Sequence, residues 1–314
     1  MNSLYFDPVM DDDARRKSLY EGQLFVYTAS PSAMELVRFA RELVEDAFSG
    51  QDPELAQHHM PVEQYAALLA DLKPKFIHHP RSKECLQGIL RELGCDLSKT
   101  YFDVPRMRTS TSENYLTSGI AYAFHPHRDT WYSAPMCQIN WWLPIYPIRP
   151  DNAMAFHPRY FREGVPNDSD RFNYYEWNAN QRRNAAQHVK SDTRWQPHAS
   201  VPLELEPDIR LLPEVGGMIL FSAAHMHSTV SNSTGRTRFS IDFRTVHLDD
   251  VEGFRGAPNV DSDCTGTSMG DYLRASDLAK IAADLVAAYE PGPTATADRR
   301  PSSTAAVASA GHTA

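Results

Sequence analysis

His127-Arg128-Asp129 is the stretch that decides the fold of this chain, together with a second histidine far downstream, His227. Side chains two residues apart in a β-strand leave the same face, so the imidazole of His127 and the carboxylate of Asp129 can reach one metal ion. His227 can supply a second imidazole from a distant strand. Two histidines and one carboxylate are the ligands of mononuclear non-heme Fe(II) sites, and they leave open positions on an octahedral metal. The three residues therefore predict an iron site that joins two strands.

The segments on both sides of the tripeptide are typical of buried strands. Residues 119–124 combine small, apolar and aromatic side chains. Residues 137–143 form a second apolar run, in which Gln138, Asn140 and Trp142 would share one face. We expect a strand to lead into the tripeptide and another to follow it.

The segment 216–229 carries the second histidine. A glycine pair at 216–217 feeds an apolar strand that ends in polar residues, so His227 is expected at a strand end. His225 lies on the same strand face and is a rival ligand, and His125 has the same relation to the first histidine. The spacing from the glycine turn favours His227. His225 and His125 are expected in supporting or substrate-pocket positions.

Arg238 opens a strictly alternating run, residues 238–244, which predicts a half-buried strand with Arg238 and Ser240 on one face. A buried guanidinium is costly unless it is paired. Its planar fork suits a carboxylate held through two hydrogen bonds, to which the Ser240 hydroxyl could add a third. The alternatives are a structural salt bridge between Arg238 and Asp242, and Arg236 in place of Arg238.

In their order along the chain, these motifs resemble the phytanoyl-CoA dioxygenase-like branch of the Fe(II)/2-oxoglutarate-dependent oxygenases. The residues that carry the likeness are His127-x-Asp129, Asn152–Pro158, the glycine-rich lead into His227, Asn232 and Arg238. The likeness spans roughly residues 119–246, and Ala153 stands where the family has glycine.

This resemblance implies a mainly β fold with flanking helices, built on a double-stranded β-helix, the cupin-like jelly roll. It implies Fe(II) held by the triad, and 2-oxoglutarate and O2 as cosubstrates. Residues in cosubstrate-binding positions would be Arg238, Ser240, Trp142, Asn140, Gln138 and Thr229. The reaction implied is oxidation of an unactivated C–H bond, most simply hydroxylation, with release of succinate and CO2. Related halogenases have a small residue in place of the carboxylate, so Asp129 favours hydroxylation.

Substrate recognition is less defined by the sequence. Trp131 and Tyr132 follow the metal-binding tripeptide and could form apolar pocket walls, and Arg128 could meet an anionic group. Residues 159–200 are polar and aromatic and could form a lid or a surface excursion. A small molecule, such as a natural-product intermediate or an amino-acid derivative, is the expected substrate, and its identity and the oligomeric state stay open.

Composition narrows the class of protein. The chain has 314 residues, 42% of them hydrophobic, which is enough for a sizeable core. A net charge of −9 argues against nucleic-acid binding. We see no apolar signal segment and no run long enough to span a membrane. The four cysteines lack metal-binding spacing and are expected to be reduced thiols, so a cytoplasmic location is expected.

We expect one oxygenase domain at residues 1–290, with a helical part at about 1–98, the β core at about 99–250 and a second helical part at about 251–290. Three helices are predicted in the first part. One begins at Ser32, with Glu35 completing a capping box, and runs to about Phe48; one begins at Pro61; one runs from Ser82 to near Gly94. Residues 291–314 are rich in small and polar residues and are predicted to be a disordered tail.

A different class remains open from the sequence. A cupin-like protein could bind another divalent metal with the same three residues and act as a hydrolase, an isomerase or a ligand-binding module without O2 chemistry. Arg238 would then have no cosubstrate to bind.

Overall fold

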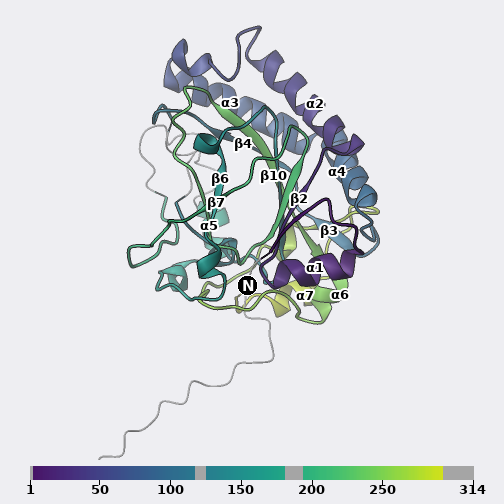
Figure 1. The fold of residues 1–314 in the computed structure, drawn as a ribbon. Helices are drawn as coiled ribbons and strands as arrows, with labels where there is room; N and C mark the ends of the chain where they lie inside the picture. The colour runs from purple at the N-terminus through teal and green to yellow at the C-terminus, as the bar shows by residue number, and fades with distance from the viewer. Residues whose placement is uncertain (1–2, 117–124, 181–193, 293–314) are drawn as a thin grey trace, which may run out of the picture.

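The computed structural model describes residues 3–116, 125–180 and 194–292, as helices packed around two β-sheets (Figure 1). The strand expected at residues 119–124 lies outside the described residues, as does nearly all of the expected tail. No helix in the described ranges is long and apolar enough to cross a membrane.

The larger sheet has eight strands and places distant parts of the chain side by side. Its order is β1 (Leu4–Phe6), β2 (Leu24–Tyr27), β8 (Met218–Ser222), β5 (Ile139–Pro144), β10 (Arg238–His247), β3 (Thr100–Phe102) and β11 (Leu273–Arg274), and β4 (Arg106–Ser110) also pairs with β10. All of these pairs are antiparallel except β1 with β2. The long strand β10 therefore lies beside β5, with Arg244 opposite Asn140.

The smaller sheet has three strands, β7 (Ile209–Arg210), β6 (Met154–Phe156) and β9 (His227–Thr229), in that order. One apolar cluster takes members from both sheets: Leu24, Val26, Trp142, Met154, Phe156, Leu211, Ile219 and Phe221. The two sheets therefore face each other across this cluster. The metal-binding candidates lie on these inner faces.

Helices cover the other face of the larger sheet. Apolar residues of α2 (Pro31–Ala47), α3 (Val62–His78) and α4 (Pro80–Glu92) share one core with Phe239, Ile241 and Phe243 of β10 (Figure 1). The prediction of a half-buried strand at 238–244 is wrong in this respect, because neither face of β10 is exposed to solvent. Between 238 and 244, the polar residues of β10 occupy every second position and face the smaller sheet.

The helix boundaries differ in part from the predictions. Ser30, not Ser32, caps α2 by accepting a hydrogen bond from the Ala33 amide, since Pro31 occupies the first helical position. The Ser32 hydroxyl instead donates to Glu92, which comes from α4. α4 likewise begins earlier than predicted, at a proline, whereas α3 starts directly after Pro61 as expected.

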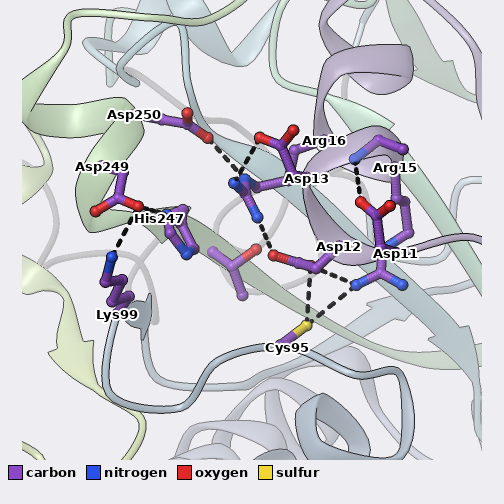
Figure 2. Close-up of polar contacts among 12 residues, drawn as sticks. Asp11, Asp12, Asp13, Arg15, Arg16, Cys95, Lys99, His247, Asp249 and Asp250 are labelled. Carbon is purple, nitrogen blue, oxygen red and sulfur yellow. Dashed lines mark hydrogen bonds and ion pairs between the residues drawn. The ribbon is translucent and has the colours of Figure 1, made fainter.

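The first hundred residues also contain a helix and strands that the predictions lacked, α1 (Asp12–Tyr20) with β1 and β2. Charged side chains join α1 to Asp250, which belongs to the short helix that follows β10 (Figure 2). The Arg16 Nε donates to Asp250 at 2.7 Å, and Arg15 reaches the Cys95 sulfur at 3.2 Å. Cys95 and the other three cysteines, all buried, form no disulfide.

The part after residue 250 contains little of the helix that was expected. α6 (Leu248–Glu252) and α7 (Ala283–Ala288) are short, and turns and irregular segments connect them. The described part of the 159–200 insertion contains α5 (Tyr174–Asn180) and the 3-10 helices Pro158–Phe161 and Ser169–Arg171. The irregular C-terminal segment contacts residues 128–131 around the candidate ligand Asp129, since Asp261 accepts hydrogen bonds from Arg128 and Trp131.

Candidate metal centre

His127 and His227 come together through the backbone. Each amide donates to the other residue's carbonyl at 3.0 Å, forming an isolated antiparallel bridge beside β9. Residues paired in this way project their side chains to the same face of a sheet. The two imidazole rings lie 4.4 Å apart between their centroids. The sequence prediction that distant strands bring these two histidines together agrees with this geometry.

The backbone also fixes the orientation of both rings. The Nδ1 of His127 lies 2.8 Å from the carbonyl of His125, and the Nδ1 of His227 lies 2.9 Å from the carbonyl of His225. Because a carbonyl only accepts, each Nδ1 carries the proton, and each Nε2 keeps its lone pair. Both histidines are therefore held in the tautomer that can bind a metal through Nε2.

Asp129 completes the group, although it does not lie in a strand with His127. It begins a 3-10 helix, Asp129–Tyr132, directly after the bridge. Its Oδ1 is 3.4 Å from the Nε2 of His127 and 4.0 Å from the Nε2 of His227. The three residues form a group whose possible ligand atoms all lie within 4.8 Å of one another. Ligands at right angles on a metal with bonds of about 2.1 Å lie about 3 Å apart, so small adjustments would suffice to bind an ion.

The electrostatic environment keeps the Asp129 carboxylate charged and the His227 imidazole neutral, which are the forms that bind a metal ion. Burial alone would raise the pKa of Asp129, but its contact with His127 and the positive charge of Arg244 outweigh it, so the pKa lies well below its ordinary range. Burial lowers the pKa of His227 to about 3. The carboxylate is therefore ionised and this imidazole is neutral at neutral pH.

Arg238 lies deep between the sheets without an ionic partner among the residues that the structure describes. Its Nη1 donates to the Asn152 carbonyl at 2.8 Å, and its guanidinium carbon lies 5.5 Å from the centre of the Trp142 ring. Among the described residues, neither the buried Nε of Arg238 nor the buried hydroxyl of Ser240, two residues further along β10, has a hydrogen-bond partner. Burial lowers the pKa of Arg238 to about 10. Both side chains therefore hold unused hydrogen-bonding capacity in the interior.

Two alternatives remained from the sequence, a salt bridge between Arg238 and Asp242, and Arg236 in place of Arg238 as the carboxylate-binding residue. Both disagree with the observed ion pairs. Asp242 is bound by Arg108 through two hydrogen bonds, at 2.7 and 3.1 Å, and within the described ranges no carboxylate lies in salt-bridge distance of Arg238. Arg236 pairs with Glu54 at 3.2 Å. A structural ion pair therefore accounts for Arg236 and not for Arg238.

The other expected cosubstrate contacts divide into two groups. Trp142 lies beside Arg238, and Thr229 follows His227 by two residues in β9 and shares its face. Gln138 and Asn140 instead donate hydrogen bonds to Asp129, at 3.2 and 2.8 Å. The sequence prediction placed these two on the correct face but assigned them to the wrong partner.

His225 is not a ligand in this geometry. Its ring is fully buried against Phe161 and its Nε2 donates to the carbonyl of Gly22 at 2.9 Å, away from the metal group. The expectation that it lines a substrate pocket is therefore corrected to a supporting position, because its backbone carbonyl orients His227. The backbone carbonyl of His125 orients His127 in the same way. The His125 ring stacks on the ring of His198, with 3.9 Å between the ring centroids.

Arg128 and Trp131 were expected in the substrate pocket, and the structure corrects both. Arg128 is almost fully buried, with Nε donating to Asp261 at 3.0 Å and the other nitrogens to backbone carbonyls, among them Ala224 at 2.6 Å and Glu163 at 2.9 Å. Trp131 is also fully buried and donates to Asp261 at 2.9 Å. Both side chains therefore serve the folded structure rather than a substrate.

Tyr132 is the expected pocket residue that does lie at the site. Its ring meets the ring of His127 edge-on at 5.4 Å, and on its other side it contacts Phe172 at the same distance. Phe172 in turn contacts Trp195. Aromatic side chains from the 159–200 insertion therefore extend outward from the metal group.

Two functional candidates, Arg244 and Tyr272, were missed by the sequence analysis. Arg244 lies 3.7 Å from Asp129 Oδ2, and Tyr272 donates to Gln138 at 2.7 Å. Arg244 has the same parity as Arg238 in the alternating run, which was a usable signal. Tyr272 lies in an irregular segment and carries no local pattern that could have revealed it.

The buried histidines make stability dependent on pH. Burial lowers the pKa of His225 to about 4, while an unfolded histidine titrates near 6.5, so between these values the unfolded chain binds more protons. We expect the metal-free protein to lose stability as the pH falls from about 6.5 to about 4, by up to about 3 kcal/mol for this residue alone. Urea unfolding of the parent and of His225→Phe, with a chelator present, measures this. A variant with an unchanged pH dependence would contradict the assignment.

Comparison with known proteins gives distant likenesses only. No protein-family model matches the chain, and no curated protein matches it. Similar solved structures include EvdO2 from Micromonospora carbonacea var. aurantiaca, with 11% identity over 76% of this chain and 92% of that chain and a TM-score of 0.45. The epimerase SnoN, in complex with Fe3+, alpha ketoglutarate and nogalamycin RO, has 15% identity over 87% and 98% and a TM-score of 0.39. The non-heme monooxygenase ThoJ has 11% identity over 69% of both chains and a TM-score of 0.35. At such values, function has to be inferred from the side chains of the site.

Proposed function

We propose that this protein is an Fe(II)- and 2-oxoglutarate-dependent dioxygenase that oxidises a C–H bond of a small molecule, most simply by hydroxylation. The observation that carries the proposal is the convergence of His127 Nε2, His227 Nε2 and Asp129 Oδ1 on one point between the two sheets. We assign the two facing sheets to a double-stranded β-helix.

The donor set fits Fe(II). Two neutral imidazoles and one carboxylate, on one side of the metal, are the ligand combination of non-heme Fe(II) oxygenases, whereas structural zinc sites are closed by four protein ligands. Among the described residues no further histidine, cysteine or acidic side chain joins the group. Open coordination positions would therefore remain for small molecules.

The unused donors fit the cosubstrate. A dicarboxylate that binds the metal with one end has a second carboxylate to place, and Arg238 Nε and Ser240 Oγ are buried donors without partners among the described residues. Trp142 lies beside Arg238, Phe221 contacts the ring of His227 at 5.0 Å, and both rings belong to the apolar cluster between the sheets. We infer that Arg238 and Ser240 hold the distal carboxylate of 2-oxoglutarate and that these rings exclude water.

The chemistry is divided between the bound groups and the chain. Fe(II), 2-oxoglutarate and O2 together supply the oxidant that removes a hydrogen atom from the substrate, with succinate and CO2 as coproducts. His127, His227 and Asp129 hold the metal on one side, Arg238 fixes the direction from which the cosubstrate binds, and Tyr132 stands beside His127 where a substrate would approach. No side chain has to act as a nucleophile or as a general base.

Turnover without a primary substrate tests the proposal. The metal-free protein, supplied with Fe(II), 2-oxoglutarate and O2, is expected to form succinate slowly and to consume O2 in the same amount, because the cosubstrate reaction proceeds at a low rate alone. His227→Ala prepared in parallel is the control for iron in solution. A parent rate equal to that of the control would favour the cupin-like alternative, in which the metal serves chemistry without O2.

A further inference from the structure

We propose that the C-terminal segment Asp261–Tyr272 is a positioning element of the metal centre, which clamps the turn carrying Asp129 and, through Tyr272 and Gln138, leaves only Oδ1 of that carboxylate facing the two histidines. The inference rests on the proposed function, and in particular on its metal site. Tyr272 and Gln138 are positioning residues, since neither contacts the three ligand atoms at the metal side.

The first observation is a relay of hydrogen bonds that ends on Asp129. The hydroxyl of Tyr272 donates to Gln138 Oε1 at 2.7 Å. This bond fixes the amide so that its Nε2 faces Asn140 Oδ1 at 2.8 Å and Asp129 Oδ2 at 3.2 Å. Asn140 Nδ2 donates to the same Oδ2 at 2.8 Å. Without the Tyr272 hydroxyl, the Gln138 amide could turn its oxygen toward the carboxylate, which would repel it.

Arg244 adds charge at the same oxygen. Its Nε lies 3.7 Å from Asp129 Oδ2, and its other nitrogens lie 3.0 Å from Asp103 and 3.5 Å from Asp242. Two amide donors and one guanidinium therefore surround Oδ2, while Oδ1 faces the two imidazoles. Gln138 and Asn140 are buried, and Asp129 and Arg244 are partly buried, so these contacts are stronger than they would be in water.

The second observation is the clamp on the turn itself. Residues on both sides of Asp129 bond to the C-terminal segment: Arg128 and Trp131 to Asp261 at 3.0 and 2.9 Å, Thr130 to Ser262 at 2.8 Å and to Cys264 at 3.0 Å, and Ser133 to Thr265 at 2.8 Å and to Ser268 at 3.1 Å. Asp261 also accepts from the amide of Val165 at 2.9 Å, which ties it to the insertion. The segment therefore determines both where the Asp129 backbone lies and how its carboxylate is turned.

The way in which the Asp129 carboxylate binds decides how many coordination positions on the metal stay open. A carboxylate that offers one oxygen occupies one octahedral position, whereas one that binds through both oxygens occupies two. Two amide donors and the charge of Arg244, all at Oδ2, enforce the first mode. Removing a residue that hydrogen-bonds to a metal ligand typically changes metal affinity by about 10- to 100-fold.

The test compares two buried tyrosines of the same region. Tyr272→Phe removes the relay hydroxyl, and Tyr289→Phe removes a hydroxyl that donates to the Val251 carbonyl at 2.8 Å and does not reach Asp129. Each metal-free protein is titrated with Co(II), a spectroscopic substitute for Fe(II). We expect Tyr272→Phe to weaken Co(II) binding about 10-fold and to change the intensity of the visible cobalt bands, which reports coordination number. Tyr289→Phe should bind Co(II) as the parent does, even if its unfolding temperature falls equally.

A double-mutant cycle isolates the relay. In a Gln138→Met background, Tyr272→Phe should have no further effect on Co(II) affinity, because its hydroxyl acts through Gln138. Equal Co(II) binding by the parent and Tyr272→Phe would overturn the inference, and so would additive effects in the cycle. If Tyr272→Phe does not fold, the cobalt bands and Co(II) affinity of Gln138→Met alone decide, since this change also removes the Gln138 donor from Oδ2. Failure of the parent itself to bind Co(II) would instead overturn the proposed metal site.

Discussion

Asp129→Asn is expected to weaken Fe(II) binding by at least about 100-fold, which corresponds to about 2.8 kcal/mol, and to abolish coupled turnover. The change removes the one charged ligand of the triad. It also sets an amide against the donors of Gln138 and Asn140, so that in either orientation one hydrogen-bonding group faces the wrong partner. Losing one member of a buried charged group commonly costs about 2–5 kcal/mol or more, close to the size expected here.

Asp277→Asn is the matched control for this substitution. Asp277 is an exposed aspartate paired with Arg274, away from the triad, and its replacement should leave Fe(II) affinity unchanged. Affinity is measured by competition with a coloured chelator under anaerobic conditions. If Asp129→Asn binds Fe(II) as tightly as Asp277→Asn, the triad does not hold the metal.

Arg238→Met is expected to raise the 2-oxoglutarate concentration needed for half saturation by about 100-fold, without changing the affinity for Fe(II) alone. Charged hydrogen bonds in a buried site supply energies of this size, and methionine roughly keeps the volume of the stem. The same change should leave the ligand-free protein equally stable or more stable. The reason is that the Arg238 guanidinium is buried with an unsatisfied Nε and without an acidic partner within the described ranges.

Arg236→Met separates this binding role from a general effect of removing an arginine from this part of the chain. Arg236 pairs with Glu54, so its loss should lower stability slightly and leave 2-oxoglutarate binding unchanged. Thermal unfolding with and without 2-oxoglutarate measures both effects. A destabilised Arg238→Met protein with normal 2-oxoglutarate binding would show that Arg238 is structural.

Much of the candidate site could be predicted because it depends on local periodicity. Alternation along residues 137–143 places Gln138, Asn140 and Trp142 on one face, and alternation from Arg238 does the same for β10. The tripeptide and His227 could be assigned as one group because their residue types match one kind of metal site. Here the pattern and the chemistry agree, and the structure brings the side chains together.

The remaining features depend on contacts between distant segments. Arg128 was expected to meet an anionic substrate group, whereas its partner Asp261 comes from the C-terminal segment, 133 residues away in sequence. Tyr272 is connected to the site through Gln138 only in the folded chain. The misplaced cap at Ser32 is a local error, since Pro31 already marked the first helical residue.

The most direct test is an anaerobic titration of the metal-free protein with Fe(II) and then with 2-oxoglutarate, followed by visible absorption. Chelation of Fe(II) by a 2-keto acid produces a charge-transfer band, and we expect this band to appear and to saturate at one Fe(II) and one 2-oxoglutarate for each chain. In Arg238→Met it should appear only at much higher 2-oxoglutarate. A folded parent protein that binds Fe(II) but gives no band at any 2-oxoglutarate concentration would contradict the proposed function.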